Sequence, residues 1–157
     1  MTGEAVETGL LLVLLLNAAS TLYLVGLNWL VQWVHYPLFA GVGEKEFAAY
    51  ERAHVARITP VVAPAMLIEA KTALVLALFP PAAIAPLLSW LGLAAVVAIW
   101  LSTFLLQVPQ HEELRSGFDA RSHDRLVRTN WIRTILWSLR GALVLCMLFG
   151  AMSRAAQ

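Results

Sequence analysis

The chain has 157 residues, of which 60% are hydrophobic and 13% are charged, with a formal net charge of +1. A soluble domain averages roughly 45–50% apolar and about 25% charged residues, so this composition excludes a disordered chain and an ordinary water-soluble enzyme. The near-neutral charge argues against nucleic-acid binding, the single Cys146 excludes an intramolecular disulfide, and the length fits one membrane domain over residues 1–157.

Four apolar stretches each approach the roughly 20 residues that a helix needs to cross a bilayer. They cover residues 9–33, 58–79, 87–108 and 134–152. No alternation typical of strands competes with them, and a spanning segment in lipid must satisfy its own backbone hydrogen bonds. The prediction is an all-α integral membrane four-helix bundle.

The first stretch resembles the apolar part of a secretory signal peptide. Residues 1–9 contain Glu4 and Glu7 but no lysine or arginine, whereas a signal peptide begins with a positively charged segment. We therefore expect an uncleaved first helix, which Pro37 and the glycines at positions 41 and 43 end.

The second and fourth helices are predicted to begin before the membrane. Residues 46–57 and 119–133 have the pattern of amphipathic helical extensions. Pro60 and Pro64 lie near the membrane entry of the second helix, where they are expected to kink it. Gly117 follows the third helix.

The basic residues predict the orientation of the chain. Eight of them lie in the first and third loop regions, and the C-terminal tail holds one, Arg154. The eight are Lys45, Arg52, Arg57, Arg115, Arg121, Arg125, Arg128 and Arg133. Cytoplasmic loops carry the excess of lysine and arginine. Both loops and both helical extensions are thus expected on the cytoplasmic side of a bacterial inner membrane, with both termini in the periplasm.

Each predicted helix brings one histidine to the cytoplasmic side. His35 ends the first helix, His54 precedes the second span, His111 follows the third, and His123 precedes the fourth. Imidazole is the commonest metal ligand, and Glu51 has the Glu-x-x-His spacing to His54 that dimetal carboxylate bundles use. These five residues are candidate ligands of a metal ion or haem. The alternative is a set of interfacial polar residues on charged helix faces.

The first helix also carries a polar stripe. Asn17, Thr21, Asn28, Gln32 and His35 fall within an arc of roughly 60° at about 100° per residue. Such a stripe is expected to face the bundle interior or a water-filled cavity. It either belongs to a site or only holds the helices together by hydrogen bonds.

Two amides are candidates to orient a cofactor. Gln32 lies on this stripe, and Asn130 lies on the extension that leads into the fourth span. Residues that hydrogen-bond to the ligands of a metal fix their orientation, and we assign this cofactor-binding role to the two side chains.

Glu69 and Arg140 lie near the middle of the second and fourth spans. An ionisable residue at that depth is a functional candidate with a partner to be named. As catalytic residues, this pair would bind or polarise a lipid-soluble substrate or relay protons. The alternative is a buried structural ion pair.

Several short motifs resemble small four-helix bacterial membrane proteins without an assigned function. One of them, Val-Pro-x-x-x-x-Leu after the third helix with a Trp and an Arg in the fourth, also resembles the anthrone-oxygenase-like membrane domain family. The motifs are Pro-Leu-Phe at residues 37–39, the stretch from Phe47 through His54 to Glu69, Val-Pro-Gln-His-Glu-Glu-Leu at residues 108–114, and Asn-Trp-Ile-Arg at residues 130–133 with Trp137 and Arg140. The resemblance covers about residues 9–150. It implies a four-helix membrane domain, and some members of the second family are linked to oxygenation of polyketide anthrones. Gln110 and His111 after Pro109 depart from that family's pattern.

Two hypotheses of different classes follow. The first is an oxygenase-like or redox enzyme that acts on a lipophilic small molecule, with a metal or haem held by the histidines. The second is a non-catalytic accessory or assembly subunit of a larger membrane complex, for which Gly26, Gly92 and Gly141 permit close helix contacts. A small proton or solute pathway along the polar stripe is a weaker third, because the sequence has no clear inverted repeat.

Overall fold

The structure, a computed structural model, describes residues 3–155 and is all-α. Of the described residues 91% are helical, and no strand occurs among them. In chain order the elements are α1 (Gly3–Leu30), the π-helical turn η1 (Val31–His35), α2 (Tyr36–Leu38), the 3-10 turn η2 (Phe39–Gly41), α3 (Glu44–Leu78), α4 (Pro86–Ser102), the π-helical turn η3 (Thr103–Gln107), α5 (Val108–Leu114) and α6 (Ala120–Ala155).

These elements join into four long helices that are apolar enough to cross a membrane. They cover Gly3–Gly41, Glu44–Leu78, Pro86–Leu114 and Ala120–Arg154. The prediction of a four-helix integral membrane protein is thus confirmed by the length and composition of the helices. Large apolar side chains such as Leu105 and Phe149 are exposed along their outer faces, as expected of surfaces that contact lipid.

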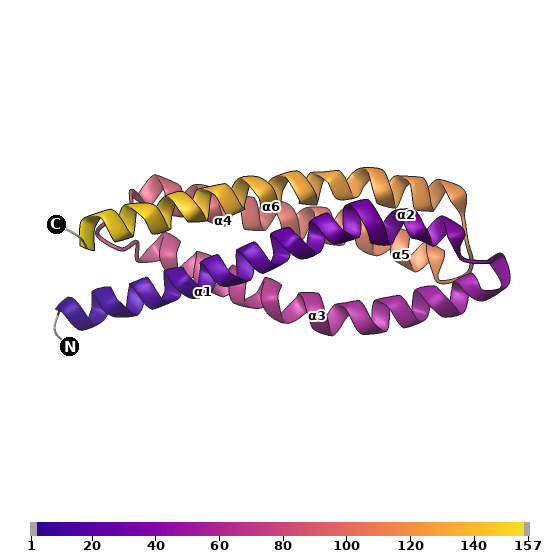
Figure 1. The fold of residues 1–157 in the computed structure, drawn as a ribbon, viewed down its shortest axis with the longest axis horizontal. Helices are drawn as coiled ribbons and strands as arrows, with labels where there is room; N and C mark the ends of the chain where they lie inside the picture. The colour runs from indigo at the N-terminus through magenta and orange to yellow at the C-terminus, as the bar shows by residue number, and fades with distance from the viewer. Residues whose placement is uncertain (1–2, 156–157) are drawn as a thin grey trace.

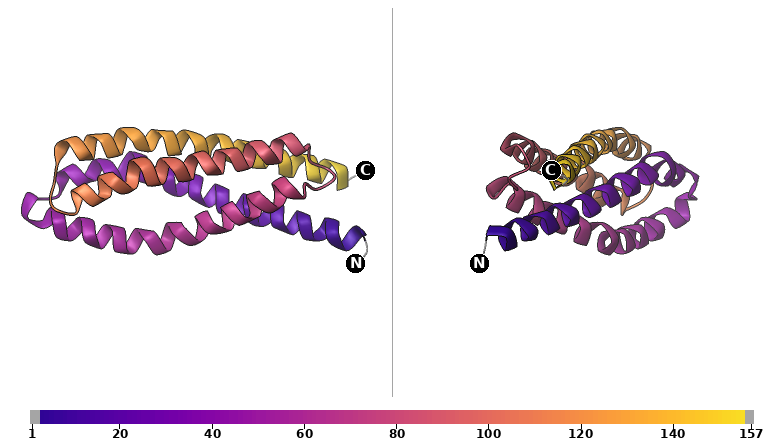
Figure 2. Two further views of the ribbon diagram at one scale, coloured as in Figure 1. Left: turned by 180° about the vertical axis from the view of Figure 1, so that it is seen from behind. Right: turned by 60° about the vertical axis from the view of Figure 1, so that its left-hand side comes forward.

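The four helices run up and down in the order of the sequence (Figure 1). α1 packs against α3 and α6, and α4 packs against the same two helices from the other side, so α3 and α6 lie diagonally opposite. Both termini lie at one end of the bundle, called the terminal end below (Figure 2). The connections at residues 42–43 and 115–119 lie at the other, called the basic end.

The first helix ends at the predicted glycines, at Gly41, and the prediction that Pro37 also ends it is wrong. A proline removes one backbone donor and its ring crowds the carbonyl of the preceding turn, and here a π-helical turn absorbs the disturbance. The Tyr36 amide donates to the Val31 carbonyl, five residues back, and the helical path continues to Gly41. The Val108 amide donates to Thr103 in the same way just before Pro109.

The predicted extensions of the second and fourth helices are confirmed. α3 begins at Glu44 and remains helical through Pro60 and Pro64, and its ribbon is bowed along its length (Figure 1). α6 begins at Ala120, where Asp119 Oδ1 accepts a hydrogen bond of 2.7 Å from the Ser122 amide. Both extensions lie at the basic end.

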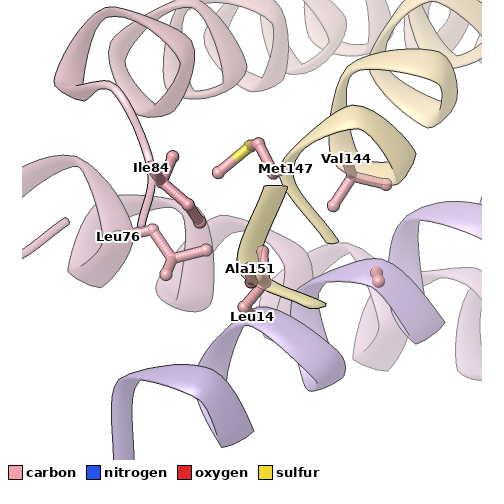
Figure 3. Close-up of a cluster of buried hydrophobic side chains, with 7 residues drawn as sticks. Leu14, Leu76, Ile84, Val144, Met147 and Ala151 are labelled. Carbon is pink, nitrogen blue, oxygen red and sulfur yellow. The ribbon is translucent and has the colours of Figure 1, made fainter. Parts of the chain in front are cut away.

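Three apolar clusters fill the bundle along its length. Figure 3 shows the cluster nearest the chain termini, formed by Leu14, Leu76, Ile84, Val144, Met147 and Ala151 with Ala18. The middle cluster contains Leu24, Met66, Ile99 and Trp137. The cluster at the basic end contains Val31, Tyr36, Phe39, Phe47, Leu114 and Leu126. Buried polar side chains lie between these clusters, and they form the candidate sites.

Candidate functional site

The polar stripe of α1 faces the interior of the bundle. Asn17, Thr21, Asn28 and Gln32 are all buried. Asn28 Nδ2 donates to Thr134 Oγ1 at 2.6 Å, which joins α1 to α6. The stripe therefore supplies hydrogen bonds between helices along most of its length.

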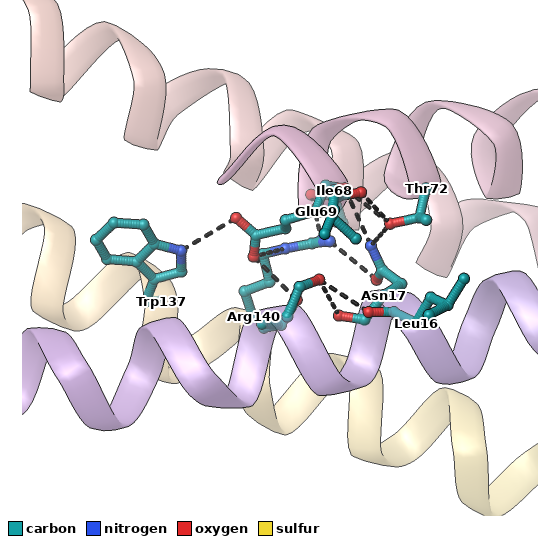
Figure 4. A network of polar contacts seen from close by, with 10 residues as sticks. Leu16, Asn17, Ile68, Glu69, Thr72, Trp137 and Arg140 are labelled. Carbon is teal, nitrogen blue, oxygen red and sulfur yellow. Dashed lines mark hydrogen bonds and ion pairs between the residues drawn. The ribbon is translucent and has the colours of Figure 1, made fainter. Parts of the chain in front are cut away.

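Glu69 and Arg140 form a buried ion pair across the bundle (Figure 4). Arg140 Nε donates to Glu69 Oε1 at 2.8 Å, and both side chains are almost fully enclosed. Thr21 also donates to Glu69 Oε1, at 2.9 Å, and Trp137 Nε1 donates to Oε2 at 3.2 Å. Both carboxylate oxygens thus have partners.

The Arg140 guanidinium is equally saturated. Its Nη1 donates to the Gly92 carbonyl at 2.7 Å, and its Nη2 donates to Asn17 Oδ1 at 3.0 Å. Asn17 in turn donates to the Glu69 carbonyl and to Thr72. The network ties α1, α3, α4 and α6 together, which is the geometry of a structural pair. A catalytic role for Glu69 and Arg140 stays a prediction.

Gln32 and Asn130 bond to each other. Asn130 Nδ2 donates to Gln32 Oε1 at 2.9 Å, and Gln32 Nε2 donates to the Val127 carbonyl at 3.2 Å. Both side chains are buried where α6 meets the first helix. Their predicted cofactor-binding role is untested, and the contacts observed are between helices.

Three of the four histidines gather at the basic end. His35 Nε2 and His54 Nδ1 are 2.8 Å apart, and the ring centroids of His54 and His111 are 5.4 Å apart. One nitrogen of the His35–His54 pair must donate and the other must accept, so at least one of these imidazoles is neutral. Sequence spacing alone did not establish this convergence.

A chain of hydrogen bonds extends from His111. Its Nδ1 is 2.6 Å from Oε1 of the fully buried Glu51, and its Nε2 is 2.9 Å from the Tyr36 hydroxyl. An ionised Glu51 only accepts, so His111 Nδ1 carries a proton, and in the neutral imidazole Nε2 then accepts from the Tyr36 hydroxyl. Tyr36 was not among the sequence candidates, although its place just before Pro37 could have marked it.

His123 lies apart from this group. Its Nε2 is 2.8 Å from the Tyr36 backbone carbonyl, and its ring stacks on Phe39 with 6.3 Å between centroids. Phe39 also contacts His35 and His54 edge-on. His123 therefore supports the segment that carries Tyr36 rather than joining the other imidazoles.

The candidate ligands do not form a ready-made metal cage. Within residues 3–155, no three histidine, cysteine, aspartate or glutamate side chains have an arrangement that would hold a metal ion. His54 is hydrogen-bonded to His35, and Glu51 is bonded to His111. Binding a metal at the predicted ligands His35, Glu51, His54 and His111 would require these hydrogen bonds to break.

A cavity of about 410 Å³ lies beside the histidines. Most of its lining is apolar, with His54 and His111 toward the basic end and Met66, Trp100 and Trp137 toward the middle of the bundle. The exposed residues Thr59, Phe104 and Val108 belong to the lining, so the cavity opens on the flank of the bundle between α3 and η3–α5.

A second groove, of about 540 Å³, lies between α1 and α3. His35 lines this groove, and His54 lines both it and the cavity. The His35–His54 pair thus forms part of the wall between two apolar spaces.

Arg133 is a further cavity residue that the sequence did not single out. There it counted as one of the basic residues that set the orientation and as the last residue of the Asn-Trp-Ile-Arg motif. In the structure it is 8% exposed, it lines the cavity, and its Cζ lies 5.0 Å from the centroid of the Trp137 ring. Its position at the start of the fourth span could have marked it as a candidate residue in the sequence.

Comparison with known proteins finds no matching family model, no matching curated protein and no matching solved structure. The functional argument therefore depends on the side chains of this chain.

Proposed function

We propose that this protein is an integral membrane enzyme that performs proton-transfer chemistry on a lipid-soluble small molecule. The observation that carries the proposal is the apolar cavity with His54 and His111 in its wall. A lipophilic molecule enters from the bilayer through the opening between α3 and η3–α5. Cavities of about 300–1,000 Å³ with a few convergent polar groups are typical small-molecule sites.

The chain Glu51–His111–Tyr36 supplies the acid–base chemistry. The buried Glu51 carboxylate fixes the tautomer of His111 and stabilises the imidazolium that forms when His111 accepts a proton. His111 Nε2 accepts the proton of the Tyr36 hydroxyl as that hydroxyl deprotonates a bound substrate. Tyr36 and His111 both line the cavity, as this role requires.

The oxygenase-like or redox version of this function adds a metal or haem at the same imidazoles. Its ligands would be His35, His54 and His111 with Glu51, after the His35–His54 and Glu51–His111 hydrogen bonds open. Neutral imidazole is the ligating form. Metal analysis and visible absorption of the detergent-purified protein distinguish this version from the metal-free relay.

The basic end is proposed to face the cytoplasm of a bacterial inner membrane, with both termini in the periplasm. The eight basic residues of the connections and helical extensions support this orientation. It places the histidines near the cytoplasmic surface.

The function is tested by comparing membrane extracts from cells that express the wild type or His111→Gln. We expect at least one lipid-soluble compound to differ in mass or amount between cells with the wild-type protein and host cells without it. Cells that express His111→Gln should match the host cells. Lys71→Gln, which changes an exposed residue of α3, is the matched control and should behave as the wild type. Identical extracts from wild type and His111→Gln, with the wild type folded, would contradict the enzyme proposal and favour an accessory subunit.

A further inference from the structure

Arg133 is a nearly buried cation whose charge has no counter-ion within residues 3–155. No carboxylate pairs with Arg133 among the described residues, and its buried Nε has no hydrogen-bond partner there. The guanidinium lies over Trp137 and beside the Tyr36 hydroxyl. The cation–π contact offsets only part of the cost of removing the charge from water.

Arg140 lies two turns further along the same helix and has a hydrogen-bond acceptor for each of its nitrogens. All three of its nitrogens donate, and one of them donates to a carboxylate. Arg133 has the same burial without these acceptors. Charged residues in membrane segments pair with one another or with backbone carbonyls, or mark substrate pathways, and Arg133 can therefore pair with an anionic group of a molecule in the cavity.

A second unpaired donor lies in the wall of the same cavity. Trp100 Nε1 is buried and has no acceptor among the described residues. A buried tryptophan N–H usually finds a partner. The two buried donors without acceptors, Arg133 Nε and Trp100 Nε1, favour a cavity ligand that carries acceptor oxygens.

We propose that the cavity binds a lipophilic carboxylate, such as a single-chain fatty acid, whose headgroup pairs with Arg133. A planar guanidinium matches a carboxylate with two parallel hydrogen bonds. A neutral carbonyl compound would leave the positive charge of Arg133 uncompensated. The apolar part of the ligand lies against Leu27, Val62 and Met66, which line the same cavity.

This proposal names the substrate class of the proposed enzyme and rests on its use of the cavity. With the carboxylate on Arg133, the headgroup lies beside the Tyr36 hydroxyl, which is 2.9 Å from His111 Nε2. The carbon atoms next to the carboxylate are then the part of the ligand nearest to the proton relay.

Binding is measured with α-bromododecanoate and its uncharged methyl ester on the full chain in phosphatidylcholine nanodiscs. Bromine quenches nearby indoles, and Trp100 and Trp137 line the cavity. We expect saturable quenching by the acid with an apparent Kd about tenfold lower than that of the ester, the difference that about 1.4 kcal/mol produces. Arg133→Gln should raise the Kd of the acid by about tenfold and leave the Kd of the ester unchanged.

Two variants separate headgroup recognition from other effects. Arg128→Gln removes an exposed arginine of α6 that does not line the cavity, so it should bind the acid as the wild type does. Ala63→Leu fills the cavity and leaves Arg133 in place, so it should weaken binding of both compounds. If Arg133→Gln does not fold, the proposal is still tested by two results. The wild-type ratio of the acid and ester Kd values tests recognition of the headgroup, and Ala63→Leu tests whether both compounds bind in the cavity.

Equal Kd values for acid and ester on the wild type would overturn the proposal, as would unaltered acid binding by a folded Arg133→Gln variant. Failure of the enzyme proposal is distinguishable, because this assay needs no turnover. Lys71→Gln, which changes an exposed residue of α3 outside the cavity lining, should retain acid binding whether or not the protein is an enzyme.

Discussion

At the scale of single residues, the two buried arginines of α6 define two different kinds of polar site. Arg140 is enclosed with Glu69 and donates through every nitrogen to groups on other helices. Arg133 is also nearly buried but lines a cavity, and within residues 3–155 it pairs with no carboxylate and its Nε has no acceptor. The first arrangement stabilises the bundle, and the second is open to a ligand.

Breaking the Glu69–Arg140 pair from one side should strongly destabilise the protein. Glu69→Leu leaves the buried guanidinium without its carboxylate, and we expect a loss of about 3–5 kcal/mol in the free energy of unfolding. Adding Arg140→Met should recover at least about 1 kcal/mol, since no unpaired charge then remains. Chemical unfolding in detergent, followed by circular dichroism, measures both changes. Strictly additive losses in the double variant would contradict a coupled pair.

Gly92 is needed because Arg140 approaches its backbone. A Cβ at Gly92 would lie 2.9 Å from Arg140 Nη1, so Gly92→Ala should destabilise the fold by about 1–3 kcal/mol through displacement of the guanidinium. Gly26→Ala is the matched control, because a Cβ there meets no atom within 4 Å. The two variants are compared by thermal unfolding in the same detergent. Equal melting temperatures would show that the Gly92 contact contributes nothing.

At the scale of elements, two π-helical turns position the candidate site. η1 ends at His35 and is followed by Tyr36, and η3 ends at Gln107, four residues before His111. π-Helical turns within helices are frequent at functional sites. Here each turn lets its helix pass a proline and continue to the basic end, where the imidazoles meet.

The N-terminus of α6 provides a test of one helix end. The hydrogen bond from the Ser122 amide lowers the pKa of the Asp119 carboxyl from its ordinary value. Stabilisation by the ionised cap is therefore fully present above that ordinary value and is lost as the pH falls through the lowered one. Asp119→Ala should increase hydrogen exchange at the Ser122 amide at neutral pH and remove this pH dependence. Asp124→Ala, an exposed residue one turn along, should leave the Ser122 amide protected.

At the scale of the whole molecule, the up-and-down order of the helices separates the two ends of the bundle chemically. The terminal end is filled by an aliphatic cluster (Figure 3). The basic end holds the aromatic residues, the histidines and the charged connections. The cavity that reaches His54 and His111 from the flank is not lined by Glu69 or Arg140, so the candidate site and the buried ion pair are separate.

The proposed orientation is checked by labelling single cysteines in intact cells and in inverted vesicles. In a Cys146→Ser background, Ser116→Cys should react with a membrane-impermeant maleimide only in inverted vesicles, because the connection 115–119 is expected in the cytoplasm. Thr8→Cys should react in intact cells, since it lies near the opposite end. The reverse labelling pattern would refute the orientation but not the fold.

The sequence by itself determined the class of protein and the course of the chain. Four apolar stretches of spanning length, with amphipathic extensions on the second and fourth, are local properties, and lipid leaves a spanning segment few alternatives to a helix. The sequence also predicted that Glu69 pairs with Arg140, because charges at similar depth in a membrane seek each other. It was wrong about Pro37, because whether a proline ends a helix or is absorbed by a π-helical turn depends on packing around it.

Only the tertiary structure decided which polar residues meet. The rotation of each helix about its axis brings His35, His54 and His111 together and turns His123 toward the Tyr36 carbonyl. The same packing gives every nitrogen of Arg140 a hydrogen-bond acceptor and leaves Arg133 in the wall of an apolar cavity. Such differences arise from contacts between residues as far apart in the chain as Tyr36 and His111, and spacing within one helix carries no information about them.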